Sequence, residues 1–305
     1  MYIEQIKNSR FTPILYLIVL FGFFALMSLN FFMSSGVDTN QIIDELITKV
    51  GTNVAFVFMV GPLSAMCLGL LFWVKFIHNQ SITSLTTSRK KIDWYRVFYA
   101  FGLWSLVTIA LTVISYYASP EDFVLNFKLT LFLIFLLLAI ILIPLQTSFE
   151  EYFFRGYMMQ FLGVISNSRL LPFLFTSITF GLMHFANPEV EKMGYIIMIY
   201  YIGTGLFLGI LTLMDEGLEL SLGFHAANNL VGALLVTSEW SAFQTNSVLK
   251  DVSEPVAGFD IVLPVLVIYP ILLFIFSKKY GWTNWKEKLT GKLIDIPQET
   301  KVEND

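Results

Sequence analysis

Eight long apolar runs constrain this chain more than any other feature. A helix that crosses a bilayer needs about 20 predominantly apolar residues, because each residue adds 1.5 Å to a path of about 30 Å. The composition agrees, since 56% of the residues are apolar and only 14% are charged. We therefore expect an all-α, polytopic membrane protein with about eight transmembrane helices. The runs lie at about 11–33, 53–74, 97–118, 129–149, 170–188, 193–214, 220–238 and 257–277.

The basic residues divide unevenly between the two sides of the membrane that eight spans define. Cytoplasmic loops are enriched in Lys and Arg, whereas acidic residues count for little. We therefore expect a multi-pass protein of the cell membrane with both termini in the cytoplasm. One side holds only Lys49, Lys128, Lys192 and Lys250. The side of the termini holds the other fifteen of the 19, which are Lys7, Arg10, Lys75, Arg89, Lys90, Lys91, Arg96, Arg155, Arg169, Lys278, Lys279, Lys286, Lys288, Lys292 and Lys301.

The ends of the chain are simple. The first run follows two basic residues and has no small-x-small cleavage site, so we expect it to be retained as a span. The polar segment after Ser277 predicts a solvated tail. No repeat or linker divides the chain. We expect one membrane domain in three parts, with N-terminal transmembrane helices at 1–128, a core at 129–238, and the last transmembrane helix and a cytoplasmic tail at 239–305.

Net charge and cysteine content exclude two classes of site. The net charge is −4, and no basic tract in an aromatic setting could follow a phosphate backbone, which argues against a nucleic-acid partner. The one cysteine, Cys67, lies in an apolar run and cannot form a disulfide framework or a cysteine metal cluster within the chain. We expect it to be a small buried residue.

A few polar residues stand in or beside the apolar runs. A charged side chain at the centre of a spanning helix costs about 2.5–3.5 kcal/mol, so its presence indicates a partner or a function. His78, by contrast, is expected in a solvated loop beside Asn79 and Gln80. A histidine such as His184 could alone be a helix–helix contact as readily as a catalytic group. The set in the runs comprises Glu150, Glu151, Arg155, His184, His225 and Asn229.

Helical geometry separates the roles of these residues. Glu151 and Arg155 are four residues apart with the acid first, which favours an ion pair on one helix face. Glu150 is turned about 100° away from Glu151, so the same pair does not easily neutralise it. His225 and Asn229 share a face by the same spacing, and we expect them to point into the bundle. We expect Asn228 to make a helix–helix or headgroup contact.

This set of side chains suits the hydrolysis of an amide bond. A carboxylate with imidazoles can activate water, and an imidazole with a carboxamide can donate hydrogen bonds to a developing oxyanion. Other hydrolase signatures are missing from the sequence: it has no G-x-S-x-G motif, no H-E-x-x-H motif and no pair of aspartates within the spans.

Three short motifs in this region resemble those of one family. EEYFFR, from Glu150 to Arg155, matches E-E-x-x-x-R; FGLMH, ending at His184, matches F-x-x-x-H; and HAANN, from His225 to Asn229, matches H-x-x-x-N. These are signatures of the CPBP intramembrane protease family, which includes type II CAAX prenyl endopeptidases and bacteriocin-processing or immunity (Abi-like) proteins. The motifs occur in the family's order, and the resemblance covers about residues 140–235.

The resemblance implies an intramembrane endopeptidase acting on a membrane-anchored peptide or protein, of the prenylated CAAX type or bacteriocin-like. It implies that Glu150 is the general base for the attacking water and that His184 helps to hold this water. His225 and Asn229 would stabilise the oxyanion, and the Glu151–Arg155 pair would brace the helix. We expect the site to open towards the cytoplasm.

The sequence leaves open whether the site uses a metal cofactor. Glu150, His184 and His225 could form a three-ligand Zn²⁺ site with one open position, and the family's naming as metalloproteases points that way. Against zinc, Asn229 is a poor zinc ligand but a good oxyanion donor. If Glu150 were a ligand, no obvious base would be left, because Glu151 is expected to pair with Arg155. We therefore favour a metal-free, glutamate-activated water.

Two other functions compete with a protease. Intramembrane ionisable groups also mark the ion pathways of transporters, although we find no inverted repeat or matching interrupted helices. A non-catalytic binding or immunity protein on the same fold also remains open. All four candidate catalytic residues are present, which argues against lost activity.

The expected spans place Glu150 and His184 at different depths in the membrane. Glu150 falls at the cytoplasmic end of the fourth run, whereas His184 falls beyond the middle of the fifth. Either the fourth span runs deeper past Pro144, or the fifth begins near Phe173 and the preceding segment LGVISNSRLL lies along the membrane interface.

Overall fold

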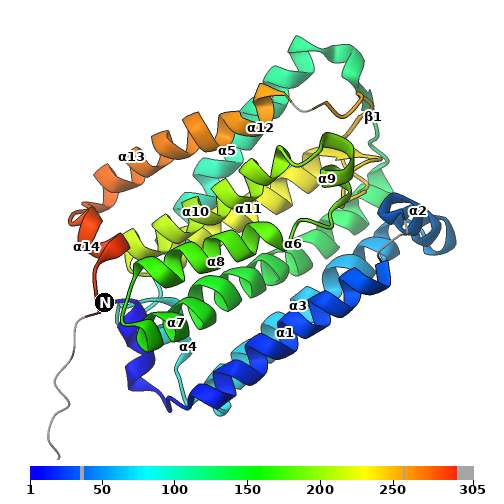
Figure 1. Ribbon diagram of the computed structural model, residues 1–305. Helices are drawn as coiled ribbons and strands as arrows, with labels where there is room; N and C mark the ends of the chain where they lie inside the picture. Colours follow the sequence, from blue (N-terminus) through cyan, green and yellow to red (C-terminus); the bar gives the residue numbers. More distant parts are fainter. Residues whose placement is uncertain (35–37, 257, 294–305) are drawn as a thin grey trace, which may run out of the picture.

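The computed structural model describes residues 1–34, 38–256 and 258–293, and shows a bundle of long helices (Figure 1). The all-α membrane fold is confirmed, apart from a small sheet. The α-helices are α1 (Pro13–Ser34), α2 (Thr39–Val50), α3 (Thr52–Phe76), α4 (Ile82–Thr86), α5 (Trp94–Ala118), α6 (Leu129–Glu151), α7 (Met159–Ser166), α8 (Leu170–Leu182), α9 (Pro188–Met193), α10 (Ile197–Asp215), α11 (Glu219–Leu235), α12 (Phe259–Leu263), α13 (Tyr269–Tyr280) and α14 (Trp285–Thr290). Short 3₁₀ helices are η1 (Ile3–Asn8) and η2 (Pro120–Asp122), and π-helical segments are η3 (Tyr152–Met158) and η4 (Pro264–Ile268).

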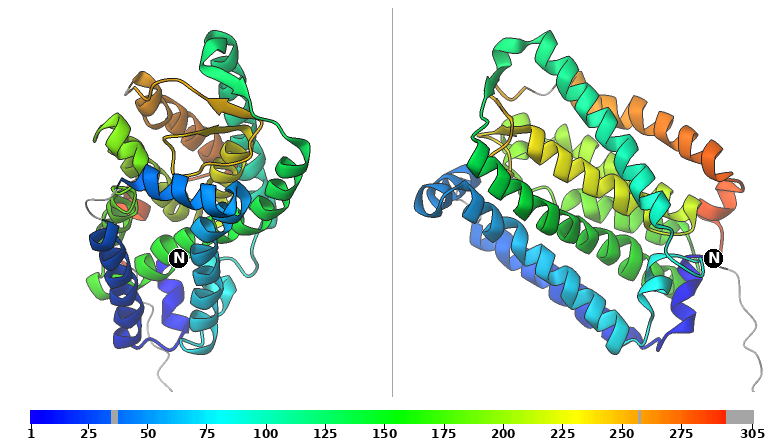
Figure 2. Two further views of the ribbon diagram at one scale, coloured as in Figure 1. Left: turned by 90° about the vertical axis from the view of Figure 1, so that its right-hand side faces the viewer. Right: turned by 180° about the vertical axis from the view of Figure 1, so that it is seen from behind.

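A three-stranded sheet marks one end of the bundle. Its order is β1-β3-β2, formed by β1 (Phe123–Leu125), β2 (Val236–Ser238) and β3 (Leu249–Asp251). β1 pairs antiparallel with β3, and β2 pairs parallel with it. Figures 1 and 2 show the sheet and α2 at one end, which we call the sheet end, and η1, α4 and α14 at the other, which we call the terminus end.

Six helices of the described residues are long and apolar enough to cross a membrane, so this is a multi-pass membrane protein. The other two expected spans form shorter helices, since α8 has 13 residues and α11 has 17. At 1.5 Å per residue, α8 extends only about 20 Å and does not cross the hydrocarbon core. The count of eight full spans therefore differs from the structure. The six are Pro13–Met33, Thr52–Phe76, Trp94–Ala118, Leu129–Ser166, Ile197–Asp215 and Ile261–Tyr280.

The fourth span is far longer than its apolar run. α6 continues without a break through the π-helical segment η3 into α7, so that one helix extends from Leu129 to Ser166. Glu150 lies well inside this helix rather than at its end. The unbroken helix agrees with the first explanation of the depth mismatch, a span that continues past Pro144. The second explanation placed the start of the fifth span near Phe173, whereas α8 begins at Leu170 and residues up to Ser166 belong to the preceding helix.

Glycines allow the helices of the inner bundle to approach closely. A Cβ atom added at Gly205 of α10 would overlap the carbonyl oxygen of Ser177 in α8, and one at Gly223 of α11 would overlap the carbonyl oxygen of Val97 in α5. Small residues at such contacts let helices pack backbone to backbone within a membrane. These contacts fix the positions of α10 and α11 in the bundle.

Ion pairs close the terminus end. Arg89 contacts Asp215 at 3.1 Å and Glu219 at 3.2 Å, and Arg96 also contacts Asp215. The N-terminal segment joins this network, since the backbone N–H of Tyr2 donates to the Glu216 carboxylate. Burial raises the pKa of the Tyr2 hydroxyl well above its ordinary value, and this hydroxyl donates to the carbonyl of Leu85. The network ties η1, α4, α10 and α11 together.

The segment after Ser277 is not a solvated tail as far as residue 293. α13 continues to Tyr280, and both Trp282 and Leu293 are buried against the bundle. The Trp282 indole donates to Asp215 at 3.2 Å. The expectation fails because large side chains that pack on the bundle alternate with the polar residues of this segment. The rest of the expected tail, 294–305, lies outside the described residues.

His78 is also not solvated, contrary to the expectation from its neighbours. Its ring is fully buried, lies 4.0 Å from the ring of Tyr16, and contacts the Tyr157 hydroxyl at 2.9 Å. Burial lowers the pKa of His78. The loop folds inwards because Gln80 also finds a buried partner, donating to Gln160 at 2.9 Å. Cys67 is buried, as expected.

Candidate active site

The four predicted catalytic residues meet at one cavity. This cavity of about 400 Å³ lies among α1, α3, α6, α8, α10 and α11. Glu150 comes from α6, His184 from the end of α8, and His225 and Asn229 from α11, and all four line it. Most of the remaining lining is aromatic or apolar. The sequence motifs, which are up to 79 residues apart, thus form a single site.

The cavity extends towards the sheet end. Its lining includes Asn187 and Glu189 from the start of α9, and Ala242 and Phe243 from the segment that follows β2. Arg89 and its acidic partners, at the other end, are not part of this lining. The opening of the site towards the cytoplasm stays a prediction. Residues of α1 and α3, including Phe23 and Leu63, line another part of the cavity wall.

Glu151 organises the buried layer behind the cavity. Its Oε1 accepts from Arg155 Nη1 at 3.1 Å and from His225 Nδ1 at 2.8 Å. The side chains of Glu151 and Arg155 are both 0% exposed, and Arg155 also donates to the carbonyl of Gly205. The expected ion pair is therefore present. Its acid does more than brace one helix, because it also fixes the imidazole ring of His225 on α11.

His225 lies between two carboxylates. Since Nδ1 donates to Glu151, the other ring nitrogen, Nε2, faces the cavity and lies 3.5 Å from Oε2 of Glu150. The side chain of Glu150 is 14% exposed, and its Oε2 accepts no hydrogen bond from the described residues. This oxygen is buried and keeps its acceptor capacity unused beside His225.

A chain of hydrogen bonds holds the other oxygen of Glu150. Gln146 donates from Nε2 to Oε1 of Glu150, and its own carbonyl accepts from Asn229 Nδ2 at 3.2 Å. Asn228 donates in turn to Asn229 at 3.1 Å and accepts from the Trp104 indole at 3.0 Å. Each amide therefore has one consistent orientation, and Asn229 keeps one N–H for another acceptor. Asn228 makes the helix–helix contact that its sequence position predicted.

His184 has one ring nitrogen free for the cavity. Its Nδ1 lies 2.9 Å from the carbonyl of Phe180, and a carbonyl only accepts, so Nδ1 donates and Nε2 of the neutral ring is an acceptor. The ring stacks on Tyr201 with centroids 4.5 Å apart. This stacking holds the imidazole at the C-terminal end of a short helix.

The three residues considered as possible zinc ligands do not form a metal site among the described residues. No group of three His, Cys, Asp or Glu side chains in the described part of the chain could hold a metal ion. Glu150 and His225 approach each other, with His225 Nε2 3.5 Å from Oε2 of Glu150, but His184 does not join them in a three-ligand group. We therefore derive no chemical step through zinc.

Sequence reasoning missed several residues of the cavity. Gln146 lies one helical turn before Glu150, and this i, i+4 spacing of polar groups in an apolar run was an available signal. Glu189 and Tyr201 gave no such signal, because the first lies in a polar loop segment and the second in an apolar run. Only the packing of α8, α9 and α10 brings them to the cavity.

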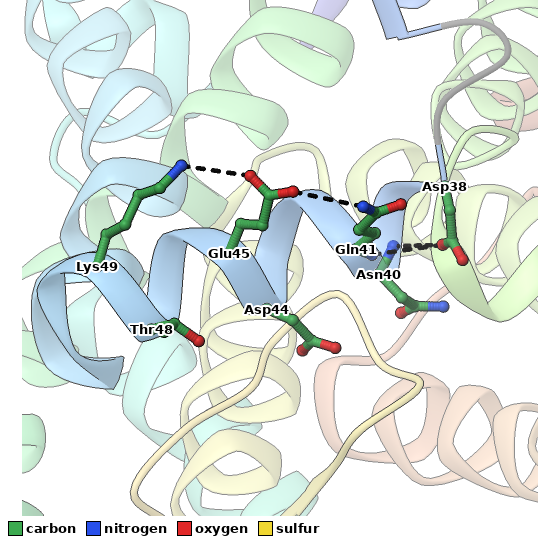
Figure 3. A pocket seen from close by; sticks show the side chains of 7 residues that line it. All are labelled: Asp38, Asn40, Gln41, Asp44, Glu45, Thr48 and Lys49. Atoms are coloured by element: carbon green, nitrogen blue, oxygen red, sulfur yellow. Dashed lines mark hydrogen bonds and ion pairs between the residues drawn. The ribbon is translucent and has the colours of Figure 1, made fainter.

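A second hollow at the sheet end has a different character. It lies on the outer face of α2 and is lined by residues such as Asp44 and Glu45 (Figure 3). Glu45 pairs along the helix, with Lys49 at 3.2 Å and Gln41 at 3.4 Å, and Asp44 accepts from Gln244 in the segment after β2 at 3.1 Å. This is the ordinary behaviour of a solvated helix face, and it shares no residue with the cavity of Glu150.

Comparison with known proteins identifies the family of the chain. Residues 126–231 match the family of type II CAAX prenyl endopeptidase Rce1-like proteins. The chain belongs to this family, whose membership indicates an intramembrane protease. It is also similar to the uncharacterized protein YyaK of Bacillus subtilis (strain 168), with 30% identity over 207 residues, which cover 68% of this chain and 67% of the relative. No solved structure matches it.

Proposed function

We propose that this protein hydrolyses peptide bonds of membrane-associated substrates with a water molecule activated by Glu150. The observation that carries the proposal is the environment of Glu150. One oxygen is held by Gln146, and the other faces the cavity beside His225 without a hydrogen bond from the described residues. A carboxylate so placed can accept a proton at hydrogen-bond distance from a bound water.

The reaction follows from this arrangement. Glu150 takes one proton from water, whose oxygen bonds to the carbonyl carbon of the substrate, while the second O–H of the water stays intact and donates a hydrogen bond to His184 Nε2. The free N–H of Asn229 donates to the resulting oxyanion, and His225 also donates from Nε2 in the form that carries a proton on both ring nitrogens, which its place between two carboxylates favours. Glu150 then gives its proton to the leaving nitrogen as the C–N bond breaks, which restores the carboxylate and releases an acid and an amine.

The test is a cleavage assay with purified protein. The protein in detergent is incubated with a panel of membrane-anchored peptides, prenylated CAAX-type and bacteriocin-like ones included, and products are separated on gels and identified by mass. Cleavage by the wild type supports a protease. Transport of the same peptides or of ions in proteoliposomes, without cleavage, would favour the transporter, and binding alone would favour an immunity or binding protein.

Asn229→Ala should lower kcat by about 10²–10³, the usual cost of removing one oxyanion donor. The effect should fall on kcat more than on KM, because the hydrogen bond strengthens only as charge develops on the oxygen. Steady-state kinetics with one cleaved peptide measures both values. Asn229→Asp keeps the size of the side chain but loses the N–H, so it should be impaired to a similar extent. Turnover within threefold of wild type in both variants would contradict the role of Asn229.

We also propose that the protein lies in the cell membrane with its terminus end in the cytoplasm. A membrane-impermeant maleimide should label Lys49→Cys, at the sheet end, on intact cells. It should label Lys90→Cys and Lys286→Cys only after permeabilisation, because these exposed positions lie at the terminus end. The parent protein is the control, since its Cys67 is buried. The reverse labelling pattern would overturn the orientation.

A further inference from the structure

The cavity contains a second carboxylate that the proposed hydrolysis does not use. Glu189 lies at the start of α9 and lines the part of the cavity nearest the sheet end. Its Oε1 accepts from the backbone N–H of Ala242 at 2.8 Å. This bond fixes the carboxylate between α9 and the segment after β2, so its direction in the cavity is set by the backbone.

The other oxygen of Glu189 is buried without a partner. Oε2 accepts no hydrogen bond from any other described residue, although it is almost completely shielded from solvent. None of the ion pairs among residues 1–34, 38–256 and 258–293 includes Glu189, and the basic residue nearest in sequence, Lys192, is exposed. A buried carboxylate normally pairs with a donor or a cation, so this oxygen indicates a group that comes from outside the chain.

The rest of the cavity favours a cation. Its described lining has carboxylates at Glu150 and Glu189 but no lysine or arginine. The ring of Tyr201, which stacks on His184, forms part of the same wall, and Asn187 donates to the Tyr201 hydroxyl at 3.4 Å. Aromatic faces next to a carboxylate attract ammonium and guanidinium groups. An anionic side chain would be repelled here.

We propose that Glu189 forms a subsite for a basic side chain of the substrate, so that the protein selects peptides with Lys or Arg close to the bond that it cuts. The inference rests on the proposed function, because it takes the cavity to be the place where the substrate binds. Glu189 determines specificity and takes no part in the chemical steps. The carboxylate pairs with the basic group while the scissile carbonyl lies between Glu150 and Asn229.

Binding can be measured apart from cleavage. The non-cleaving Glu150→Gln protein, in an uncharged detergent, is titrated into fluorescent apolar peptides that are acetylated and amidated at their ends and carry one central lysine, norleucine or glutamate. Fluorescence anisotropy gives each Kd. We expect the lysine peptide to bind at least tenfold more tightly than the norleucine peptide, and the glutamate peptide to bind most weakly.

Matched variants assign this preference to one residue. In Glu150→Gln/Glu189→Gln the ratio of the two Kd values should fall to within about threefold of unity, since glutamine can still accept from Ala242 but carries no charge. Glu150→Gln/Glu191→Gln is the control, because Glu191 is the exposed acid of the same helix, and it should keep the full ratio. Glu189→Asp, which keeps the charge on a shorter side chain, should keep part of it.

The outcomes separate this inference from the proposed function. The subsite is overturned if Glu150→Gln binds the lysine and norleucine peptides equally well. It is also overturned if the ratio of the two Kd values stays unchanged in both Glu189→Gln and Glu189→Asp. A preference that depends on Glu189, found in a protein whose wild type cuts none of the peptides, supports the subsite and overturns the protease. If Glu189→Gln lowers the thermal unfolding temperature, the comparison is made with Glu189→Asp, whose unchanged ratio at full size would overturn the subsite in the same way.

Discussion

Glu150→Gln should abolish peptide hydrolysis while leaving the protein folded. Removing a general base typically lowers the rate about 10²–10⁴-fold. The larger of these losses leave a rate at the detection limit of a gel assay. The substitution keeps the shape of the side chain and an acceptor for Gln146, so the chain of amides from Trp104 to position 150 should persist. Initial rates with a cleaved peptide, and thermal unfolding in the same detergent, measure the two effects.

The control for this prediction is Glu191→Gln, the same chemical change on an exposed side chain outside the cavity. It should retain wild-type turnover. Near-wild-type turnover of Glu150→Gln would show that another group activates the water. The closest candidate is His184, whose Nε2 is free, and His184→Ala would then carry the loss.

The sequence predicted the local parts of the site because they follow from helical spacing alone. Glu151 and Arg155 pair at i, i+4, and both charges are buried together. Gln146 follows the same rule towards Glu150 and could have been found. The contact of His225 with both glutamates could not, because it depends on how deeply α11 packs on its neighbours, and this depth is set by contacts such as Gly223 against Val97.

Hydropathy misplaced the helix ends for a related reason. Charged residues at 150–155 look like the end of a span, but Glu151 and Arg155 neutralise each other inside the protein, and the helix continues to Ser166. Conversely, α8 ends at Leu182 although the apolar residues continue beyond it. The chain forms a turn there, and His184 of this turn lines the cavity. Hydropathy averaged along the sequence contains no information on ion pairs or turns. The positions of the site residues along their helices therefore could not be predicted from it.

Glu151→Gln should destabilise the protein more than any other single Glu→Gln substitution considered above. It leaves the guanidinium of Arg155 buried without its anion, and breaking a buried pair in this way costs about 3–5 kcal/mol. It also weakens the hydrogen bond that orients His225, so any protein that remains folded should turn over slowly. Thermal unfolding in detergent and the yield of purified protein measure the first effect.

A matched pair elsewhere in the chain isolates the effect of burial. Glu45 and Lys49 have the same i, i+4 spacing, but their side chains are 56% and 71% exposed, and Glu45→Gln should change the unfolding temperature little because water screens the pair. The double variant Glu151→Gln/Arg155→Met should recover part of the lost stability, since no buried charge is then left alone. It should not recover turnover, because His225 still lacks the carboxylate that fixes its ring. If Glu151→Gln unfolds at the same temperature as Glu45→Gln, the Gly205 carbonyl alone satisfies Arg155, and the buried pair contributes no more stability than the exposed one.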